Sequence, residues 1–468
     1  MELKVLAAAM IIATTTQITG CGGGGGGSSA DKAHVFNLTN AKKVLNTNAD
    51  IALAAYEDSV TTAKSLQTAL STFKTSPTAA NLTAAKKAWL VSREPYGQTE
   101  VYRFRNSPID STDYASEDGP EGSINAWPLG EALIDYVTTG TDFGADQVGV
   151  SAHQTGVADP IPTNNIINST AIVINEALLA KSATADDEHD VIAGYHAIEF
   201  LLWGQDLNAG GSADTLTTRD ASGGQRPLTD FTTTANADRR HQYLEVAAAL
   251  LVKDLEAVRD GWKAGASYRT AFTTITNEAQ GKQKLTEILT GMGTLSEGEL
   301  AGERMQIAYS SNSQEDEHSC FSDNTHRDIW LNAEGVSNSF YGDYEGYSSD
   351  LSTVDNVVTR SVQGYGLDDY LADAGMNKLK KEVMDALSKT ETNYKAIDDL
   401  ARNGGMPLDQ QIMPANRGSD KPMYKTIVSL NAQSSVIQKL ATKLGLGDVV
   451  DDDGSACDTT KPDNSCGD

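Results

Sequence analysis

The spacing of apolar positions predicts helices along most of the chain. Apolar residues recur three and four positions apart over residues 38–73 and 78–104, with Ser76 and Pro77 forming a turn between them. This is the period of an amphipathic helix, so we expect an antiparallel helix pair here. The same pattern returns in later segments, which are residues 166–179, 187–203, 237–262, 271–290, 297–309, a helix after 323, 367–387 and 421–444. Around residues 129–137 we expect at most a short helix.

Two stretches interrupt the helical pattern. Residues 105–128 contain several prolines and glycines and read as a loop, and residues 209–224 read as a glycine-rich insertion. Runs that alternate apolar and polar side chains with β-branched residues do not occur at any length. We therefore predict an all-α fold without strands.

The length of the chain favours two domains. About 440 residues follow the N-terminal segment, which is more than one hydrophobic core usually serves. We expect two helical-bundle domains, residues 34–293 and 294–446, followed by an acidic tail, residues 447–468.

A repeated string suggests that these two domains are related by an internal repeat. The triplet Asp-Glu-His that ends at His189 precedes His196 by seven positions, and the same triplet ending at His318 precedes His326 by eight. The string is short, so it adds only modestly to the argument from length.

The first 33 residues predict export and lipid attachment. Lys4 precedes an apolar run, residues 5–12, that is too short to span a bilayer, and small residues stand directly before Cys21. We expect residues 1–20 to be a lipoprotein signal peptide and Cys21 to carry lipid. Residues 21–33, rich in glycine and serine, then form a flexible tether. We therefore expect a protein anchored at the cell envelope, on the outer membrane. Either side of that membrane, periplasmic or external, is compatible with this pattern.

The net charge and the cysteines indicate which binding partners and which compartment suit this chain. The net charge of −27 argues against nucleic acid, whose phosphates require a basic face, and makes cations the natural partners. Most of the 64 acidic residues are expected to form a solvated surface. Cys457 and Cys466 bracket a short loop, which predicts a disulfide in an oxidising compartment, and Cys320 is left as a structural thiol.

One segment, Gly194 to Gly204, carries the candidate chemistry. His196 and Glu199 are three positions apart, so a helix presents both side chains on one face, where they can share an ion of iron, zinc or manganese. The alternative is a core histidine beside a solvent-facing glutamate. On a continuous helix His189 would lie roughly 10 Å away along the axis, which is too far for the same ion and makes it a neighbour.

The string Gly-Tyr-His-Ala-Ile-Glu at this position resembles the GxHxxE motif of the imelysin family, also called peptidase M75. This family includes iron-regulated protein A, insulin-cleaving membrane proteases and periplasmic iron-uptake proteins. A second segment, which contains Arg93, Glu94 and Tyr96 and ends at Glu100, is similar to the family's Arg-x-x-Tyr-x-x-x-Glu segment. The resemblance implies that Glu100 is a third metal ligand. Iron-uptake relatives have an acidic residue where this chain has Gly97, and Glu94 is the candidate to replace it.

The same resemblance implies an arrangement for the whole chain. It predicts two helical domains with the site in the cleft between them, and His318, Asp323 and His326 as further residues that face this cleft. An alternative role for Asp323 is to cap the helix that follows it.

Our first functional interpretation is a lipid-anchored protein that binds a metal ion, iron rather than zinc, or a metal complex such as haem during uptake. An outer-membrane receptor or permease is then the expected protein partner. A metal-dependent peptidase is the alternative, although the chain has no HExxH motif and no clear general base. A metal-free peptide-binding protein with the same fold is the third possibility.

Overall fold

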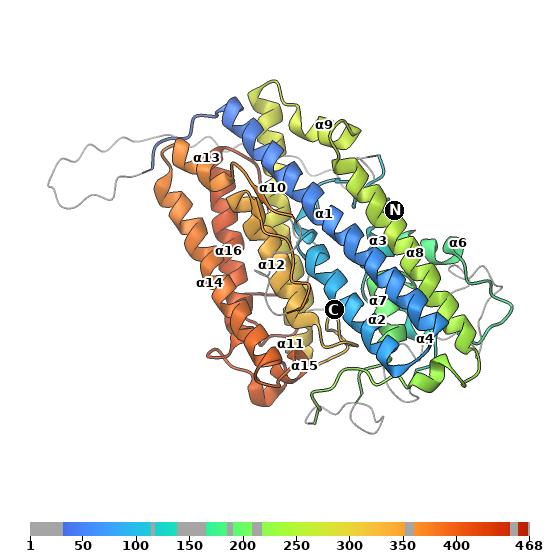
Figure 1. Ribbon diagram of the computed structural model, residues 1–468. Helices are drawn as coiled ribbons and strands as arrows, with labels where there is room; N and C mark the ends of the chain where they lie inside the picture. The colour runs from blue at the N-terminus through green and yellow to red at the C-terminus, as the bar shows by residue number, and fades with distance from the viewer. Residues whose placement is uncertain are drawn as a thin grey trace, which may run out of the picture.

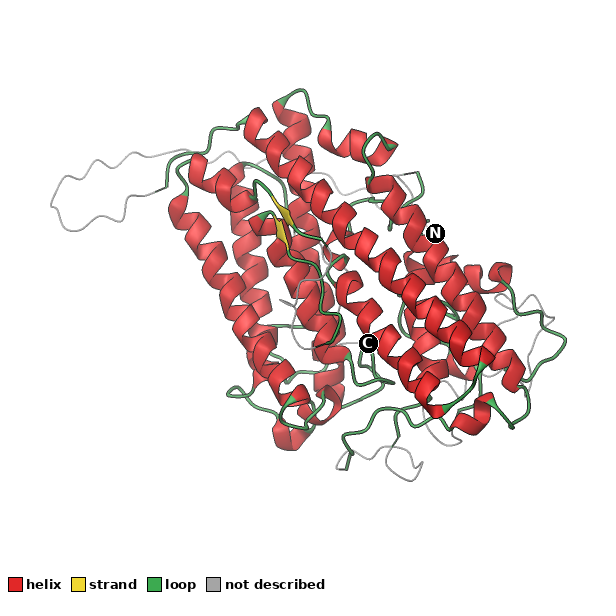
Figure 2. Ribbon diagram, in the orientation of Figure 1, coloured by secondary structure: helices red, strands yellow, loops and turns green. Residues whose placement is uncertain are grey.

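The computed structural model describes residues 31–113, 118–137, 165–184, 191–207, 218–351, 360–449 and 457–466. Helices dominate these residues, as the hydrophobic pattern predicts (Figure 2). The α-helices are α1 (Leu38–Thr75), α2 (Ala79–Gly97), α3 (Glu121–Ile124), α4 (Glu131–Ile134), α6 (Glu176–Leu179), α7 (Gly194–Trp203), α8 (Ala237–Trp262), α9 (Ser267–Thr273), α10 (Glu278–Thr294), α11 (Ile307–Ser311), α12 (Thr325–Tyr341), α13 (Leu367–Asp373), α14 (Asn377–Arg402), α15 (Leu408–Gln411) and α16 (Pro422–Leu444). The 3-10 helices are η1 (Glu100–Tyr102), η3 (Ala180–Thr184), η5 (Leu228–Phe231) and η7 (Pro414–Asn416), and η6 (Leu295–Gln306) is a π-helix.

Helix α1 organises the first half of the chain. The Asn37 side chain caps it by accepting a hydrogen bond from the main-chain N–H of Asn40 at 3.1 Å. Buried residues then recur from Ala41 to Phe73, so the helix is covered on more than one side. It packs against both α2 and α8, which lie beside it in Figure 1.

The second half forms another group of helices. Helix α16 packs against α14, α10 and η6, and α14 also contacts α12 (Figure 1). Helix α12 in turn lies against α2. A Cβ on Gly335 would lie 2.5 Å from the carbonyl oxygen of Gln98, so this glycine permits the close approach of the two segments.

The predicted domain boundary at residues 293 and 294 falls inside a helical run. Helix α10, the π-helix η6 and α11 follow one another without a break from Glu278 to Ser311. The division into two domains at this position stays a prediction.

Several predicted helices are shorter or divided. Residues 166–179 form only α6, because the main-chain N–H groups of Ile166 and Ile167 donate to the carbonyl oxygens of Leu133 and Ile134 in α4. Residues 271–290 are divided between α9 and α10, since the side chain of Asn277 caps a new helix. Tertiary contacts and a cap outweigh the local pattern at both places. The short helix expected around residues 129–137 is confirmed as α4, a single turn.

The helix predicted at residues 367–387 begins at the right residue, but it is divided into two helices and ends too early. Helix α13 ends at Asp373, and Gly375 has a left-handed φ of 71° that separates it from α14. Helix α14 then continues to Arg402. The sequence pattern missed the last turns because apolar residues are sparse there, with Tyr394 and Ile397 among the few buried ones.

One short strand pair was also missed. Strands β1 (Asp343–Tyr344) and β2 (Val362–Gln363) pair antiparallel, with Asp343 opposite Gln363 (Figure 2). Two residues are too few to show an alternating pattern in a sequence.

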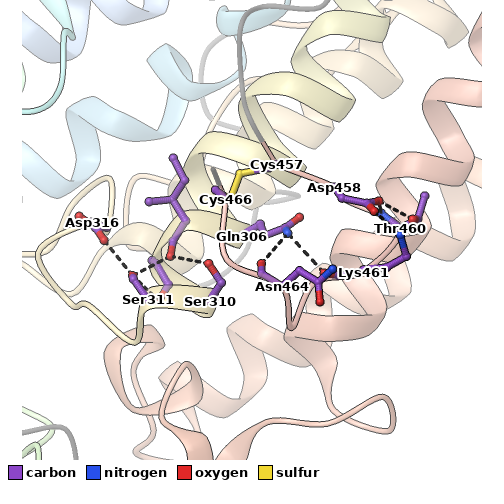
Figure 3. The surroundings of a disulfide bond; sticks show 12 residues. Gln306, Ser310, Ser311, Asp316, Cys457, Asp458, Thr460, Lys461, Asn464 and Cys466 are labelled. Atoms are coloured by element: carbon purple, nitrogen blue, oxygen red, sulfur yellow. Dashed lines mark hydrogen bonds and ion pairs between the residues drawn. A yellow bond between two sulfur atoms is a disulfide. The ribbon is translucent and has the colours of Figure 1, made fainter. Parts of the chain in front are cut away.

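The acidic tail returns to the helical body. A disulfide joins Cys457 to Cys466, the pair for which the spacing predicts a bond. Near this bond Gln306 of η6 donates hydrogen bonds to the carbonyl oxygens of Asn464 and Lys461, as Figure 3 shows. Residues 457–466 are thereby attached to η6.

None of the helices formed by the described residues is long and apolar enough to cross a membrane. The predicted signal peptide and Cys21 lie outside the described residues, and so does His189. Cys320 is a buried free thiol.

Candidate functional site

Helix α7 carries the His-x-x-Glu pair and is buried along its whole length. It begins at Gly194 rather than near residue 187, because Gly194 has a φ of 80° and a Cβ there would lie 2.4 Å from the carbonyl oxygen of Ile124. The predicted helix is therefore too long by at least residues 191–193.

Glu199 orients His196. The Nδ1 atom of His196 lies 2.9 Å from Oε2 of Glu199. The other carboxylate oxygen, Oε1, accepts hydrogen bonds from the main-chain N–H of Ser322 at 3.0 Å and from its hydroxyl at 2.6 Å. Both oxygens of Glu199 are therefore engaged, whereas Nε2 of His196 is buried and has no hydrogen-bond partner.

A second histidine–carboxylate pair faces the first. The Nδ1 atom of His318 lies 2.8 Å from Oδ2 of Asp328. The rings of His196 and His318 are 4.8 Å apart between centroids and nearly perpendicular, at 81°. Nε2 of His318 has only a long contact of 3.5 Å with the Asn125 side chain. Both imidazoles are therefore held through Nδ1, an arrangement typical of histidines that bind a metal through Nε2.

Asp328 connects this pair to α2. Its Oδ1 atom accepts a hydrogen bond from Nε of Arg93 at 3.2 Å, and its Oδ2 atom accepts one from the hydroxyl of Ser319 at 2.5 Å. Arg93 also donates to the side chain of Asn125 and lies over the ring of Tyr195, 4.9 Å from its centroid. Arg93, named from the sequence, thus stabilises the charge of Asp328.

Glu94 and His326 lie in a neighbouring buried network. Nε and Nη2 of Arg327 donate to the two carboxylate oxygens of Glu94 at 3.0 and 2.7 Å. Arg327 and His326 also approach Asp398, at 3.5 and 3.6 Å. Glu94 therefore ties α2 to α12, and His326 points toward α14.

Glu100 pairs with arginines. It lies on η1, after the end of α2, and its Oε2 atom accepts hydrogen bonds from Arg304 at 2.8 Å and Arg103 at 3.2 Å. Although burial favours the protonated form, these two charges lower the pKa of Glu100 to about 2. Its Oε1 atom is buried without a hydrogen-bond partner. A ligand role for Glu100 stays a prediction.

A cavity of about 550 Å³ opens beside this network. Its lining comes from both halves of the chain and consists of Arg103, Glu121, Asn125, Ala126, Trp127, Pro128, Glu299, Glu303, Arg304, Ile307, Asp316 and His318. The ring of Trp127 in this lining packs on His196, 5.0 Å away between centroids. His318 thus reaches the cavity directly, and His196 lies behind its wall.

Both imidazoles are neutral at ordinary pH. Burial lowers the pKa of His196 well below its usual value, and the nearby His318 and Arg93 lower it further. Burial and the charge of Arg304 lower the pKa of His318 to about 4, against the opposing effect of Asp328. Neutral imidazole is the form that binds a metal ion. Burial also raises the pKa of Glu199 well above its usual value.

The remaining candidates from the sequence lie elsewhere. Tyr96 is fully buried, with its ring 4.9 Å from that of Tyr195. Asp323 belongs to a separate acidic cluster with Asp206 and Asp409.

Sequence reasoning did not find several residues that hold the histidines. Asp328 and Ser322 contact the two motif residues directly, and Asn125 and Trp127 border them. Asp328 stands in the first turn of α12, where an acidic residue is ordinary, so no local pattern distinguished it.

Comparison with known proteins supports the resemblance. The sequence model of the imelysin family, peptidase M75, matches residues 52–437. Iron-regulated protein A of Synechococcus elongatus is 34% identical over 107 residues, which cover 21% of this chain and 28% of that protein. The match thus spans less than a third of the relative.

Two solved structures share the fold over most of their length. An iron-regulated protein A precursor from Parabacteroides distasonis superimposes with a TM-score of 0.57 and 16% identity. An imelysin-like protein from Psychrobacter arcticum gives a TM-score of 0.53 and 15% identity. Each comparison covers 89% of this chain and 98% of the other. At this identity the likeness concerns the fold alone.

Proposed function

Because the chain belongs to the imelysin family, we propose that it binds an iron ion or a small iron complex beside His196 and His318, as a component of uptake at the cell envelope. The similarity to a protein named iron-regulated protein A supports iron as the first metal to test. The cavity then corresponds to the predicted cleft between the two halves of the chain.

The observation that carries this proposal is the buried, unpartnered Nε2 atom of His196. A buried polar atom without a partner is costly, and native structures usually satisfy it with protein, water or a ligand. His318 lies within 4.8 Å of the same ring and is likewise held by a carboxylate at Nδ1. Two neutral imidazoles aligned in this way form a donor pair suited to iron(II) or zinc(II).

The cavity favours a ligand larger than a bare ion. Its volume of about 550 Å³ falls in the range of pockets that hold small molecules. Arg103 and Arg304 add positive charge to the lining, and Glu121, Glu299 and Glu303 add negative charge. Such a mixed lining can bind the polar groups of a chelated metal as well as the metal itself.

A metal-dependent peptidase is the second candidate, and Glu121 is the observation that favours it. Glu121 lines the same cavity. Burial raises its pKa, and Glu100 and Glu299 raise it further, although Arg103 opposes them. A carboxyl group with a raised pKa beside a metal can act as the general base of a hydrolysis reaction.

The N-terminal segment supports the proposed location. An apolar run, small residues before Cys21 and a glycine tether are the pattern of a lipoprotein. We propose attachment to the outer membrane through lipid on Cys21, with a receptor or permease as the partner that delivers or receives the metal.

The test is a metal titration of the purified chain with anaerobic iron(II) and with zinc(II), comparing wild type with His196→Gln and His318→Gln. We expect each substitution to raise the Kd at least tenfold, because each removes one nitrogen donor. His34→Gln is the matched control, since His34 bonds to Tyr370 far from α7 in sequence and is expected to leave binding unchanged.

Insulin digestion is measured on the same samples. Digestion that requires both the metal and His196 would assign the protein to the peptidases. Metal binding that is equal in wild type and both site variants would contradict the proposed site.

A further inference from the structure

A second group of carboxylates lies at the other end of α7. Asp206 follows that helix, Asp323 stands just before α12, and Asp409 belongs to α15. One carboxylate oxygen from each residue lies within 4.8 Å of the others. Asp206 and Asp409 are buried and Asp323 is half-buried, so the group is enclosed but still reaches the surface at one residue.

Glu317 is an independent sign that something binds here. Only 1% of this residue is exposed, and its Oε1 atom has no hydrogen-bond partner. Glu317 lies close enough to Asp409, Asp323 and Asp206 for their charges to act on its carboxyl group. The orphaned carboxylate therefore faces the three aspartates, and all four would repel one another if ionised.

Arg219 brings positive charge to this group. It lies close enough for its charge to act on Glu317, and it donates hydrogen bonds to the carbonyl oxygens of Asp409 and Asn312. Burial and the neighbouring acids nevertheless raise the pKa of Asp206 to about 10. Buried carboxylates in such a group are stable only if they are protonated or neutralised by a cation.

We propose that Asp206, Asp323 and Asp409, together with Glu317, form a binding site for a hard divalent cation of the calcium type. The group formed by the described residues is Asp206, Asp323 and Asp409, without histidine or cysteine, and the carboxylate of Glu317 adds only further oxygen. Oxygen-only ligand sets favour calcium, magnesium or manganese over zinc and copper. Calcium fits best because it accepts irregular geometry and carboxylates that bind through one or both oxygens.

This cation site shares a loop with the histidine site. Glu317 and Asp323 face the cation, whereas His318 and Ser322 contact Asp328 and Glu199. Calcium would therefore hold the loop in the conformation that presents His318 to the cavity. The cation site does not depend on the proposed iron site, because the two use different residues.

The test measures the Tm of the full chain in EGTA and in excess calcium, magnesium or zinc, with bound metal counted after equilibrium dialysis. We expect calcium to raise the Tm of wild type by about 3 °C and one calcium ion to be retained. Asp206→Asn and Asp409→Asn should remove most of the rise. In EGTA these variants should melt no lower than wild type, because the neutral amide relieves repulsion.

Asp385→Asn is the control, since Asp385 lies on the exposed face of α14 and pairs with Lys381. It should keep the full calcium effect, and so should His196→Gln, which separates this site from the proposed function. The proposal is overturned if calcium does not bind, if zinc replaces it in preference, or if both site variants keep the wild-type response. If either aspartate variant fails to fold, Glu317→Gln supplies the same comparison.

Discussion

The imidazole rings of His196 and His318 pack edge to face with their centroids 4.8 Å apart, although one belongs to α7 and the other to the loop before α12. Each ring has its Nδ1 atom beside a carboxylate, Glu199 for the first and Asp328 for the second. The GxHxxE motif therefore supplies one of two histidine–carboxylate pairs, and the other comes from the second part of the chain.

Asp328→Asn is expected to weaken iron(II) binding by about 10- to 100-fold, because His318 loses the carboxylate that orients it. Stability should also fall by about 3–5 kcal/mol, since the buried Arg93 guanidinium loses its anion. Metal titration and urea denaturation measure the two effects. Asp399→Asn, on the exposed face of α14, is the control. Unchanged binding in a folded Asp328→Asn protein would show that His318 needs no such partner.

The substitution Ser322→Ala tests whether the hydroxyl of Ser322 holds the side chain of Glu199 in position. The substitution removes the hydroxyl bond of 2.6 Å but keeps the main-chain N–H bond. We expect a stability loss of about 1–2 kcal/mol and a several-fold rise in the Kd for iron(II). Ser65→Ala is the matched control, because the exposed Ser65 hydroxyl donates back to the carbonyl oxygen of Thr61 in the same helix. Equal effects of the two substitutions would argue against a positioning role for Ser322.

The Glu94–Arg327 pair is expected to hold α2 against α12. Breaking it from either side, with Glu94→Met or Arg327→Met, should cost about 3–5 kcal/mol, because the remaining charge stays buried. The double substitution should cost clearly less than the sum of the two. Urea denaturation of the four proteins measures this coupling. Strict additivity would mean that the pair adds nothing beyond its separate contacts.

The lowered pKa of Glu100 predicts that the folded protein loses part of its stability in acid. Its folded pKa of about 2 is lower than the value of about 4.3 in an unfolded chain, because Arg304 and Arg103 favour its charged form. The resulting stabilisation is present above pH 4.3 or so and is lost as pH falls toward 2, by about 3 kcal/mol. Glu100→Gln should therefore flatten the dependence of stability on pH in this window.

Denaturation measured from pH 5 to pH 2 tests this expectation. Glu382→Gln is the control, since Glu382 pairs with Lys439 on the surface. A steep wild-type slope that persists in Glu100→Gln would assign the acid sensitivity to other carboxylates.

The sequence by itself determined the helical class of the fold, the family and one half of the site. Apolar spacing is a local property, so the long helices α1, α8 and α16 were predicted close to their true ends. The His-x-x-Glu motif is also local, because one helical turn is enough to bring His196 and Glu199 together.

Only the tertiary structure decided what these residues contact. Glu100 pairs with Arg304, which is 204 positions further along the chain. Asp328 reaches His318 only because the loop before α12 folds back on that helix. The start of α7 at Gly194 likewise follows from the close approach of Ile124. Periodicity and spacing carry no information on such distances, because packing of whole helices sets them.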